Sequence, residues 1–293
     1  VLEKLEALYE KLLLPLERVI SDAKQIILSP DEQLNAVPFA ALRNERDGKF
    51  AVERWTINYV TSGRELMRND SEPWPKVATA NEGNLMMVVD PSYDVPIRGG
   101  TPALPSETSN TNVARPAASL FEELGHFRRL EETSREADEI SQLKELQSLK
   151  KQVFSQDLAL EQSIVTARRP LVLHMATHGF FLRGHESFRH IRSENALFRS
   201  GIALTGANHA KDANSHFDGL LTAYEVTGMD LHGTDLVVLS ACETGLGEYV
   251  NGEGVYGLRR AFALSGARHL IMSLWKVDDA MTARQMVSFY KQY

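Results

Sequence analysis

Three apolar runs in the second half of the chain end in residues that could act on a peptide carbonyl. His178-Gly179 follows LVLHMAT, Cys242 comes two residues after DLVVLS, and Asp278-Asp279 closes the stretch HLIMSLWKVDD. Ligands of open α/β sheets bind beyond the carboxyl ends of the strands. If the three runs are parallel strands, a nucleophile, an acid/base and an acidic pocket wall therefore meet on one rim.

These residue types suit acyl transfer on a peptide bond. A thiolate is the nucleophilic form of cysteine, and a free cysteine is mostly protonated at neutral pH. A nearby His178 would raise the thiolate fraction of Cys242 or shuttle the proton. The backbone N–H groups of Gly179 and Cys242 would supply an oxyanion hole, and a glycine lets the chain approach a substrate carbonyl closely.

Each of these residues also has a plain structural interpretation. Cys242 is the only cysteine of the chain and could be a small buried side chain at a strand end. His178 could be a polar cap on its strand. Asp278 and Asp279 directly precede AMTARQMVSFY, where either would favour the start of a helix. The residues by themselves leave both interpretations open.

Two motifs suggest ligands that their context excludes. GEGVYG at 252–257 has the glycine spacing of a dinucleotide fingerprint, but about ten loop residues are expected between it and the preceding strand. HMATH at 174–178 spaces two histidines by four, but it is β-like and carries Met175 where a zinc peptidase needs glutamate. We therefore expect no cofactor and no metal, and His174 is expected to be a buried strand residue.

The elements that must position the candidate residues are short and apolar. Three runs are apolar on both faces, as parallel strands covered by helices are: 171–177, 235–240 and 269–275. Earlier apolar runs lie at 24–29, 55–60 and 84–89. The amphipathic segment 257–266 separates the last two strands, ends in a capping glycine and completes a βαβ unit.

Helical periodicity is clearest in the first half of the chain. Leucines at three- and four-residue spacing predict a helix over 2–20. A charged surface helix is predicted over 133–150, with TSRE as a capping box at its start. Residues 91–119 and 183–218 are expected to be long loops, and a loop as long as the second is usually functional or disordered. The predicted architecture is a parallel or mixed six-stranded sheet with helices on both faces.

Composition narrows the class of protein further. The 293 residues carry a net charge of −7, which argues against nucleic acid as the main ligand. No apolar run approaches the length that crosses a bilayer. A single cysteine cannot form an intrachain disulfide and fits a reducing cytoplasm. The chain starts at Val1 and stops inside an apparent helix, so we expect it to be one domain of a longer protein.

The motifs together resemble a known family. HMATHGFF, DGLLTAYEV, LVVLSACETGLG, GEGV and RHLIMSLWKVDD look like a CHAT domain, a caspase-like, separase-related family of clan CD cysteine peptidases. The upstream stretches LSPDEQLNAVPFAAL, VVDPSYD and LEETSREADEI resemble its N-terminal half. The resemblance implies a caspase-hemoglobinase-like three-layer sandwich, with a supporting part over 1–165 and a catalytic half over 166–293.

The resemblance also implies a mechanism and a setting. It implies a His178–Cys242 dyad, in which the histidine protonates the leaving amine across the scissile bond. In separase-like relatives an acidic residue of the WKVDD segment lines the pocket for a basic P1 residue. Asp279 matches best, with Asp278 beside it, and the choice between a basic and an apolar P1 stays open.

The implied function is that of a bacterial, cytoplasmic endopeptidase in a defence or cell-death response. Its expected partners are a protein substrate and an upstream TPR-like repeat region or activator, without direct nucleic-acid or membrane binding. The segment 183–218 is the expected gate. The alternative is a catalytically silent scaffold that acts as a protein-interaction module.

Overall fold

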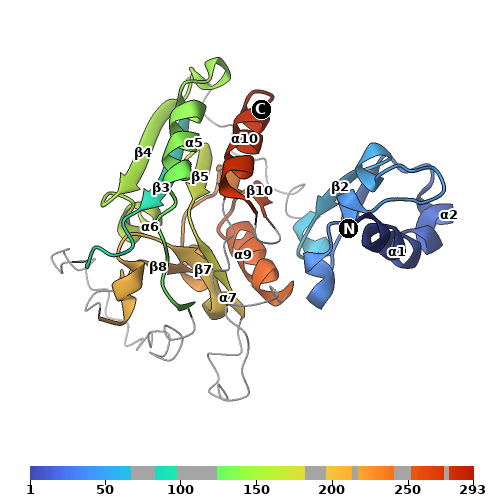
Figure 1. The fold of residues 1–293 in the computed structure, drawn as a ribbon, viewed down its shortest axis with the longest axis horizontal. Coiled ribbons are helices and arrows are strands. Elements are labelled where there is room, and N and C mark those ends of the chain that lie inside the picture. The colour runs from blue at the N-terminus through green and yellow to red at the C-terminus, as the bar shows by residue number, and fades with distance from the viewer. Residues whose placement is uncertain (67–82, 98–123, 182–195, 213–216, 241–251, 274–276) are drawn as a thin grey trace. The chain divides into compact units, whose positions relative to one another are not determined.

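The computed structural model describes the chain in seven stretches: residues 1–66, 83–97, 124–181, 196–212, 217–240, 252–273 and 277–293. The chain divides into two compact units, Val1–Pro73 and Trp74–Tyr293 (Figure 1). Among the described residues, no helix is both long enough and apolar enough to cross a membrane.

The smaller unit is a helical segment followed by two paired strands. Its elements are α1 (Leu2–Leu12), α2 (Glu17–Ile20), β1 (Gln25–Leu28) and β2 (Thr56–Tyr59). The strands match two of the predicted apolar runs and pair in parallel. The single helix predicted over 2–20 is wrong, because a 3₁₀ turn at Leu14–Leu16 separates α1 from α2. That turn contains Pro15, which lacks an N–H and disfavours a continuous helix.

The larger unit is built on a five-stranded parallel sheet. Its strands are β3 (Asn84–Pro91), β4 (Lys150–Gln156), β5 (Val172–Ala176), β9 (Leu236–Leu239) and β10 (His269–Met272), in the order β10-β9-β5-β3-β4. The three runs predicted as parallel strands are thus neighbours and run parallel. The six-stranded sheet is not confirmed among the described residues. Strands from both sides of position 165/166 share this sheet.

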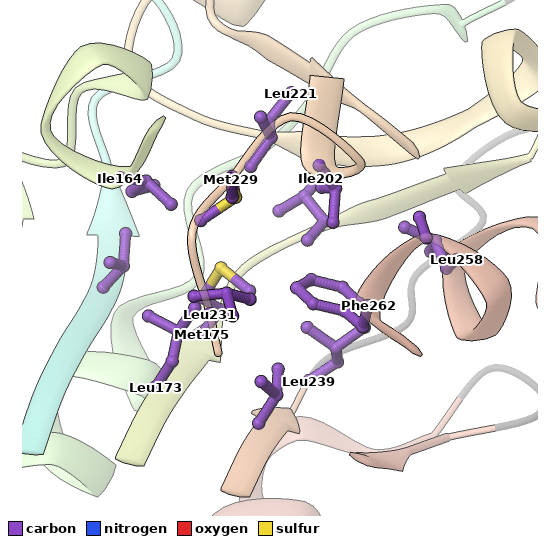
Figure 2. Packing of buried hydrophobic residues seen from close by; sticks show 14 of the residues in the cluster. Ile164, Leu173, Met175, Ile202, Leu221, Met229, Leu231, Leu239, Leu258 and Phe262 are labelled. Atoms are coloured by element: carbon purple, nitrogen blue, oxygen red, sulfur yellow. The ribbon is translucent and has the colours of Figure 1, made fainter. Parts of the chain in front are cut away.

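Helices cover both faces of this sheet. The helices α5 (Glu131–Ser141) and α10 (Asp279–Tyr290) pack side by side on one face (Figure 1). On the other face lie α9 (Gly252–Leu264), α6 (Glu161–Val165) and α8 (Ala223–Val226). Figure 2 shows Phe262 of α9 among Met175, Leu239 and Ile202. The layered α/β arrangement agrees with the predicted sandwich.

A second, antiparallel sheet continues from the end of β5. It consists of β6 (Gly179–Phe181), β7 (Ser200–Ala203) and β8 (Leu220–Thr222), in that order. The prediction of one long loop over 183–218 is therefore wrong. The apolar island IALTGA contributes to the buried strand β7, which α7 (Ala196–Arg199) precedes. Residues 182–195 and 213–216 lie outside the described residues, as do residues 98–123 of the other expected loop.

Two predicted helices have different bounds from those expected. Helix α5 begins at Glu131, so Thr133 lies in its first turn and the predicted capping box is absent. The Thr133 hydroxyl instead donates to the carbonyl of Leu130 (2.7 Å) and accepts from the N–H of Asp90 (2.9 Å). Helix α9 begins at Gly252, so GEGVYG belongs to a helix and not to a loop. Gly266 follows α9 with φ +102°, as expected of a C-terminal capping glycine.

Candidate active site

His178 lies at the junction between the two sheets. Strand β5 ends two residues before it, and β6 begins at the next residue. The His178 carbonyl accepts a hydrogen bond from the N–H of Ala203 in β7 (2.8 Å), and the side chain is only 2% exposed. The backbone of this histidine is thus fixed by both sheets. Its predicted place just past a parallel strand is confirmed, whereas its catalytic role stays a prediction.

A main-chain carbonyl orients the imidazole ring of His178. Nε2 lies 2.6 Å from the carbonyl oxygen of Arg128, fifty residues earlier in the chain. A carbonyl oxygen only accepts, so Nε2 must carry a proton. In the neutral ring, Nδ1 is then the nitrogen that can take up a proton. Contact with Arg128 therefore selects one tautomer and assigns the basic position to Nδ1.

Aromatic rings pack against the histidine. The ring centroids of Tyr93 and Phe127 lie 5.3 and 5.6 Å from that of His178. The Thr177 hydroxyl donates to the carbonyl of Ala203 (2.6 Å), so the Tyr93 hydroxyl is the donor in its 2.7 Å contact with Thr177. These contacts restrict the imidazole to one orientation within an apolar surrounding.

Tyr93 stays neutral beside the histidine. Burial raises the pKa of Tyr93 well above its ordinary value, and the negative charges of Asp90 and Asp279 raise it further. Tyr93 therefore acts as a hydrogen-bond donor and not as a second base. The effect of Asp279 also means that this carboxylate lies close enough to the His178 surroundings to act on them electrostatically.

The predicted nucleophile lies just beyond the last described residue of its strand. The Ser240 N–H, directly after β9, donates to the carbonyl of Met175 in β5 (2.9 Å). Cys242 follows two residues later and lies outside the described residues. Gly179 opens β6 and is buried. The dyad and the oxyanion hole formed by Gly179 and Cys242 therefore remain predictions.

The two acidic candidates occupy the start of α10. Asp278 is the N-cap residue: its Oδ1 accepts a hydrogen bond from the N–H of Met281 (2.9 Å). The capping interpretation is thus confirmed for Asp278. Asp279 is the first residue of the helix and half-buried. A substrate-binding role for either residue stays a prediction.

Behind the rim lies a buried polar network that sequence reasoning found only in part. Glu136 of α5 accepts a hydrogen bond from Ser240 Oγ (2.6 Å), and its Oε1 lies 3.1 Å from His174 Nε2, within ion-pair distance. His174 Nδ1 is 3.1 Å from the hydroxyl of Tyr290 in α10. All four side chains are buried, which confirms the prediction for His174. The network ties α5 and α10 to the middle of β5 and to the residue that follows β9.

A pocket of about 420 Å³ lies beside the end of β4, and a buried acid forms part of its wall. Glu161 lines it, is 2% exposed, and accepts the N–H groups of Asp218 (2.9 Å) and Gly219 (3.0 Å). Burial raises the pKa of Glu161 well above its ordinary value near 4.5, and the charges of Glu225 and Asp218 add to the effect. The folded chain therefore holds this proton more tightly than the unfolded chain does.

Glu161 should make the protein less stable as pH rises. Because its pKa is raised in the folded state, its contribution to the free energy of unfolding falls as pH increases from about 4.5 through the folded pKa. We expect Glu161→Gln to remove this fall, as measured by urea unfolding at several pH values between about 5 and 7. The exposed Glu145→Gln is the control. Equal pH slopes for wild type and Glu161→Gln would contradict the prediction.

Sequence reasoning missed the groups that hold His178. The Arg128 carbonyl belongs to the main chain, so no pattern of side chains in the sequence could predict its contact with His178. Phe127 and Tyr93 are distant in sequence from the motif that they pack against. The stretch VVDPSYD did contain Tyr93, but nothing in its composition indicated contact with a histidine.

The parallel sheet between helices, with a buried histidine past its central strand, is compatible with the caspase-like class of α/β sandwiches. Comparison of the chain with family models matches residues 2–293 to the CHAT domain. The chain therefore belongs to the CHAT domain family.

Two curated relatives share the name Tetratricopeptide repeat protein 28. The mouse and human proteins are each 25% identical to this chain, over alignments of 294 and 309 residues that cover 98% of it. The chain spans only 12% of the mouse protein and 11% of the human protein. The similarity thus concerns one region of much longer proteins.

Proposed function

We propose that this CHAT domain is a cysteine endopeptidase that uses Cys242 as nucleophile and His178 as acid/base. The observation that carries the proposal is the buried, tautomer-fixed imidazole of His178 beyond β5. The contact places the ring proton on Nε2 and the basic position on Nδ1, as an acid/base requires. The family membership of the chain adds support.

Strand topology brings the proposed dyad within reach. Strands β5 and β9 are neighbours, and Ser240 bonds directly to Met175. Cys242 comes two residues after Ser240, and two residues span at most about 7 Å. His178 comes three residues after Met175. Both residues thus follow in sequence the carboxyl ends of two adjacent parallel strands, which supports the proposed dyad.

The proposed reaction has two stages. His178 accepts the proton of the Cys242 thiol, the sulfur attacks the scissile carbonyl carbon, and the carbonyl oxygen takes the negative charge towards the N–H groups of Gly179 and Cys242. As the C–N bond breaks, His178 donates that proton to the leaving amine. Water then attacks the thioester and gives a proton to His178, which returns it to the sulfur as the C–S bond breaks, so that the carboxylic acid leaves and the thiol is restored.

An acidic pocket wall is proposed at the start of α10. The charge of Asp279 acts on Tyr93, which packs against His178, so this carboxylate could also attract a basic P1 side chain. Asp278 is engaged as a helix cap and would contribute only its charge. We therefore assign the main substrate-binding role to Asp279.

Regulation is proposed to come from outside the domain. The names of the mouse and human relatives refer to tetratricopeptide repeats. An upstream repeat region or an activator would control a cytoplasmic peptidase in a defence or cell-death response.

Covalent probes test the proposal directly. The chain would be incubated with a peptidyl acyloxymethyl ketone bearing Arg at P1, beside a matched Leu probe, and its intact mass recorded. We expect the Arg probe to add its mass once, Cys242→Ala to abolish the addition, and His178→Ala to slow it strongly. Labelling by the Leu probe alone would support the peptidase proposal and contradict the proposal of an acidic pocket.

The same experiment distinguishes the scaffold alternative. If neither probe labels the chain alone, the measurement is repeated on the full-length protein with its activator. Absence of labelling there would overturn the peptidase proposal in favour of a protein-interaction module. Labelling that survives Cys242→Ala would show a reaction at another group and would also overturn it.

A further inference from the structure

An ion pair between Asp90 and Arg129 lies next to the Arg128 carbonyl that orients His178. Asp90, at the end of β3, is completely buried, whereas its partner Arg129 is about half exposed. The guanidinium binds the carboxylate through two atoms: Nε lies 2.9 Å from Oδ1 and Nη2 lies 2.7 Å from Oδ2. Such two-point contacts fix the orientation of both groups.

Asp90 is held in an unfavourable conformation at this place. Its φ is +45°, in the left-handed region that few residues other than glycine adopt. Ser134 Oγ donates to its carboxylate (3.1 Å), and its own N–H donates to Thr133 (2.9 Å). A buried charge and a strained backbone persist only where the surrounding contacts enforce them, and such positions cluster at functional sites.

The ion pair bears directly on the His178 contact. Arg129 follows Arg128, and the Arg128 carbonyl belongs to the peptide group that joins these two residues, so an anchored Arg129 restricts the direction of that oxygen. On the other side, the Phe127 N–H donates to Asn208 Oδ1 (2.9 Å) and the Phe127 carbonyl accepts from Asn208 Nδ2 (3.0 Å). The contacts of Phe127 and Arg129 thus restrict the Arg128 carbonyl from both sides in the chain.

We propose that Asp90 and Arg129 are positioning residues that hold the Arg128 carbonyl against Nε2 of His178 and so keep the ring in the tautomer with its proton on Nε2 and its basic position at Nδ1. This inference rests on the proposed function for its catalytic consequence. Its geometric content, the tautomer of His178, is independent of any activity. Neither residue needs to touch substrate.

The alternative is a clamp that stabilises the fold without influencing the histidine. Both interpretations predict that variants lose stability, so stability cannot separate them. Only the positioning role predicts that variants of Asp90 and Arg129 change which ring nitrogen of His178 carries the proton. The decisive measurement is therefore spectroscopic.

The test uses the variants Arg129→Lys, Arg129→Met and Asp90→Asn in the whole chain. Lysine keeps the charge but cannot bind the carboxylate through a fork. The ¹⁵N shifts of the His178 ring report its tautomer, and His178→Gln assigns the signals. We expect the Nε2–H tautomer in wild type and a mixture of tautomers in Arg129→Met and Asp90→Asn, with Arg129→Lys in between.

The rate of Cys242 labelling by the acyloxymethyl ketone is the second readout. We expect Arg129→Met to slow it by about 10- to 100-fold, the effect typical of residues that orient a functional side chain through a hydrogen bond. Arg135→Met is the matched control, because Arg135 is an exposed arginine of α5 that pairs only with exposed Glu132 and Glu139 among the contacts observed for it. This control should label at the wild-type rate.

The outcomes separate this inference from the proposed function. Variants that keep both the wild-type tautomer and the wild-type labelling rate would overturn the positioning role while leaving the peptidase intact. Absence of labelling in the full-length protein with its activator, together with an altered tautomer in the variants, would overturn the peptidase and support the positioning role. If Asp90→Asn fails to fold, the two variants of the half-exposed Arg129 decide the question.

Discussion

Replacing His178 with glutamine is expected to lower kcat/KM for cleavage of a peptide amide by about 100- to 10,000-fold, the usual range for loss of a general acid/base. The glutamine amide can still donate to the Arg128 carbonyl, so the local contact at 2.6 Å can be kept. It cannot take up and return a proton in the reaction. The measurement is steady-state cleavage of a peptide whose P1 residue matches the more reactive probe.

His269→Gln is the control for this prediction. His269 is exposed and opens β10, at the opposite end of the sheet from His178. Its replacement should leave kcat/KM unchanged. A His178→Gln variant that cleaves at the wild-type rate would remove the histidine from the mechanism.

Replacing Glu136 with alanine is expected to lower the free energy of unfolding by about 1–3 kcal/mol, the range found when buried polar groups lose a hydrogen-bond partner. The substitution withdraws the acceptor of Ser240 Oγ and the carboxylate that faces His174, and both side chains stay buried. Buried polar groups without partners carry their full cost of desolvation. Urea unfolding monitored by near-UV circular dichroism measures the change.

The matched control lies one turn away on the same helix. Glu139 of α5 is about half exposed and pairs with the exposed Arg135. Exposed pairs of this kind contribute little, so Glu139→Ala should change the free energy of unfolding by less than about 1 kcal/mol. Equal effects of the two substitutions would mean that the Glu136 network does not stabilise the protein.

The parallel strands were predictable because burial on both faces leaves continuous apolar runs. Such runs identified the buried strands β3, β5 and β9. Strand β10 is an edge strand whose residues are exposed or half-buried, and it was identified because its sequence HLIM is mostly apolar. Strand β4 was missed because it is an edge strand with the sequence KKQVFSQ and none of its residues is fully buried. Its charged start was taken for the end of the preceding surface helix, which stops at Ser141.

The candidate site was predictable only where a side chain follows a strand. That rule located His178, because β5 does end just before it. It could not reveal the buried Asp90 and Arg129, since an ion pair between residues 39 positions apart leaves no local pattern. The start of helix α9 was predicted five residues too late, at residue 257 and not at Gly252. The glycines in GEGVYG favour loops over helices, and packing on the sheet overrides that preference.

The contact between His178 and the Arg128 carbonyl has an evolutionary consequence. A main-chain oxygen is present whichever side chain occupies position 128, so that position can drift without changing the imidazole. The constraint is displaced onto its neighbours: position 129 must supply a forked cation and position 90 a short carboxylate. Among related chains, substitutions at 90 and 129 should therefore arise together, while 128 accepts almost any residue.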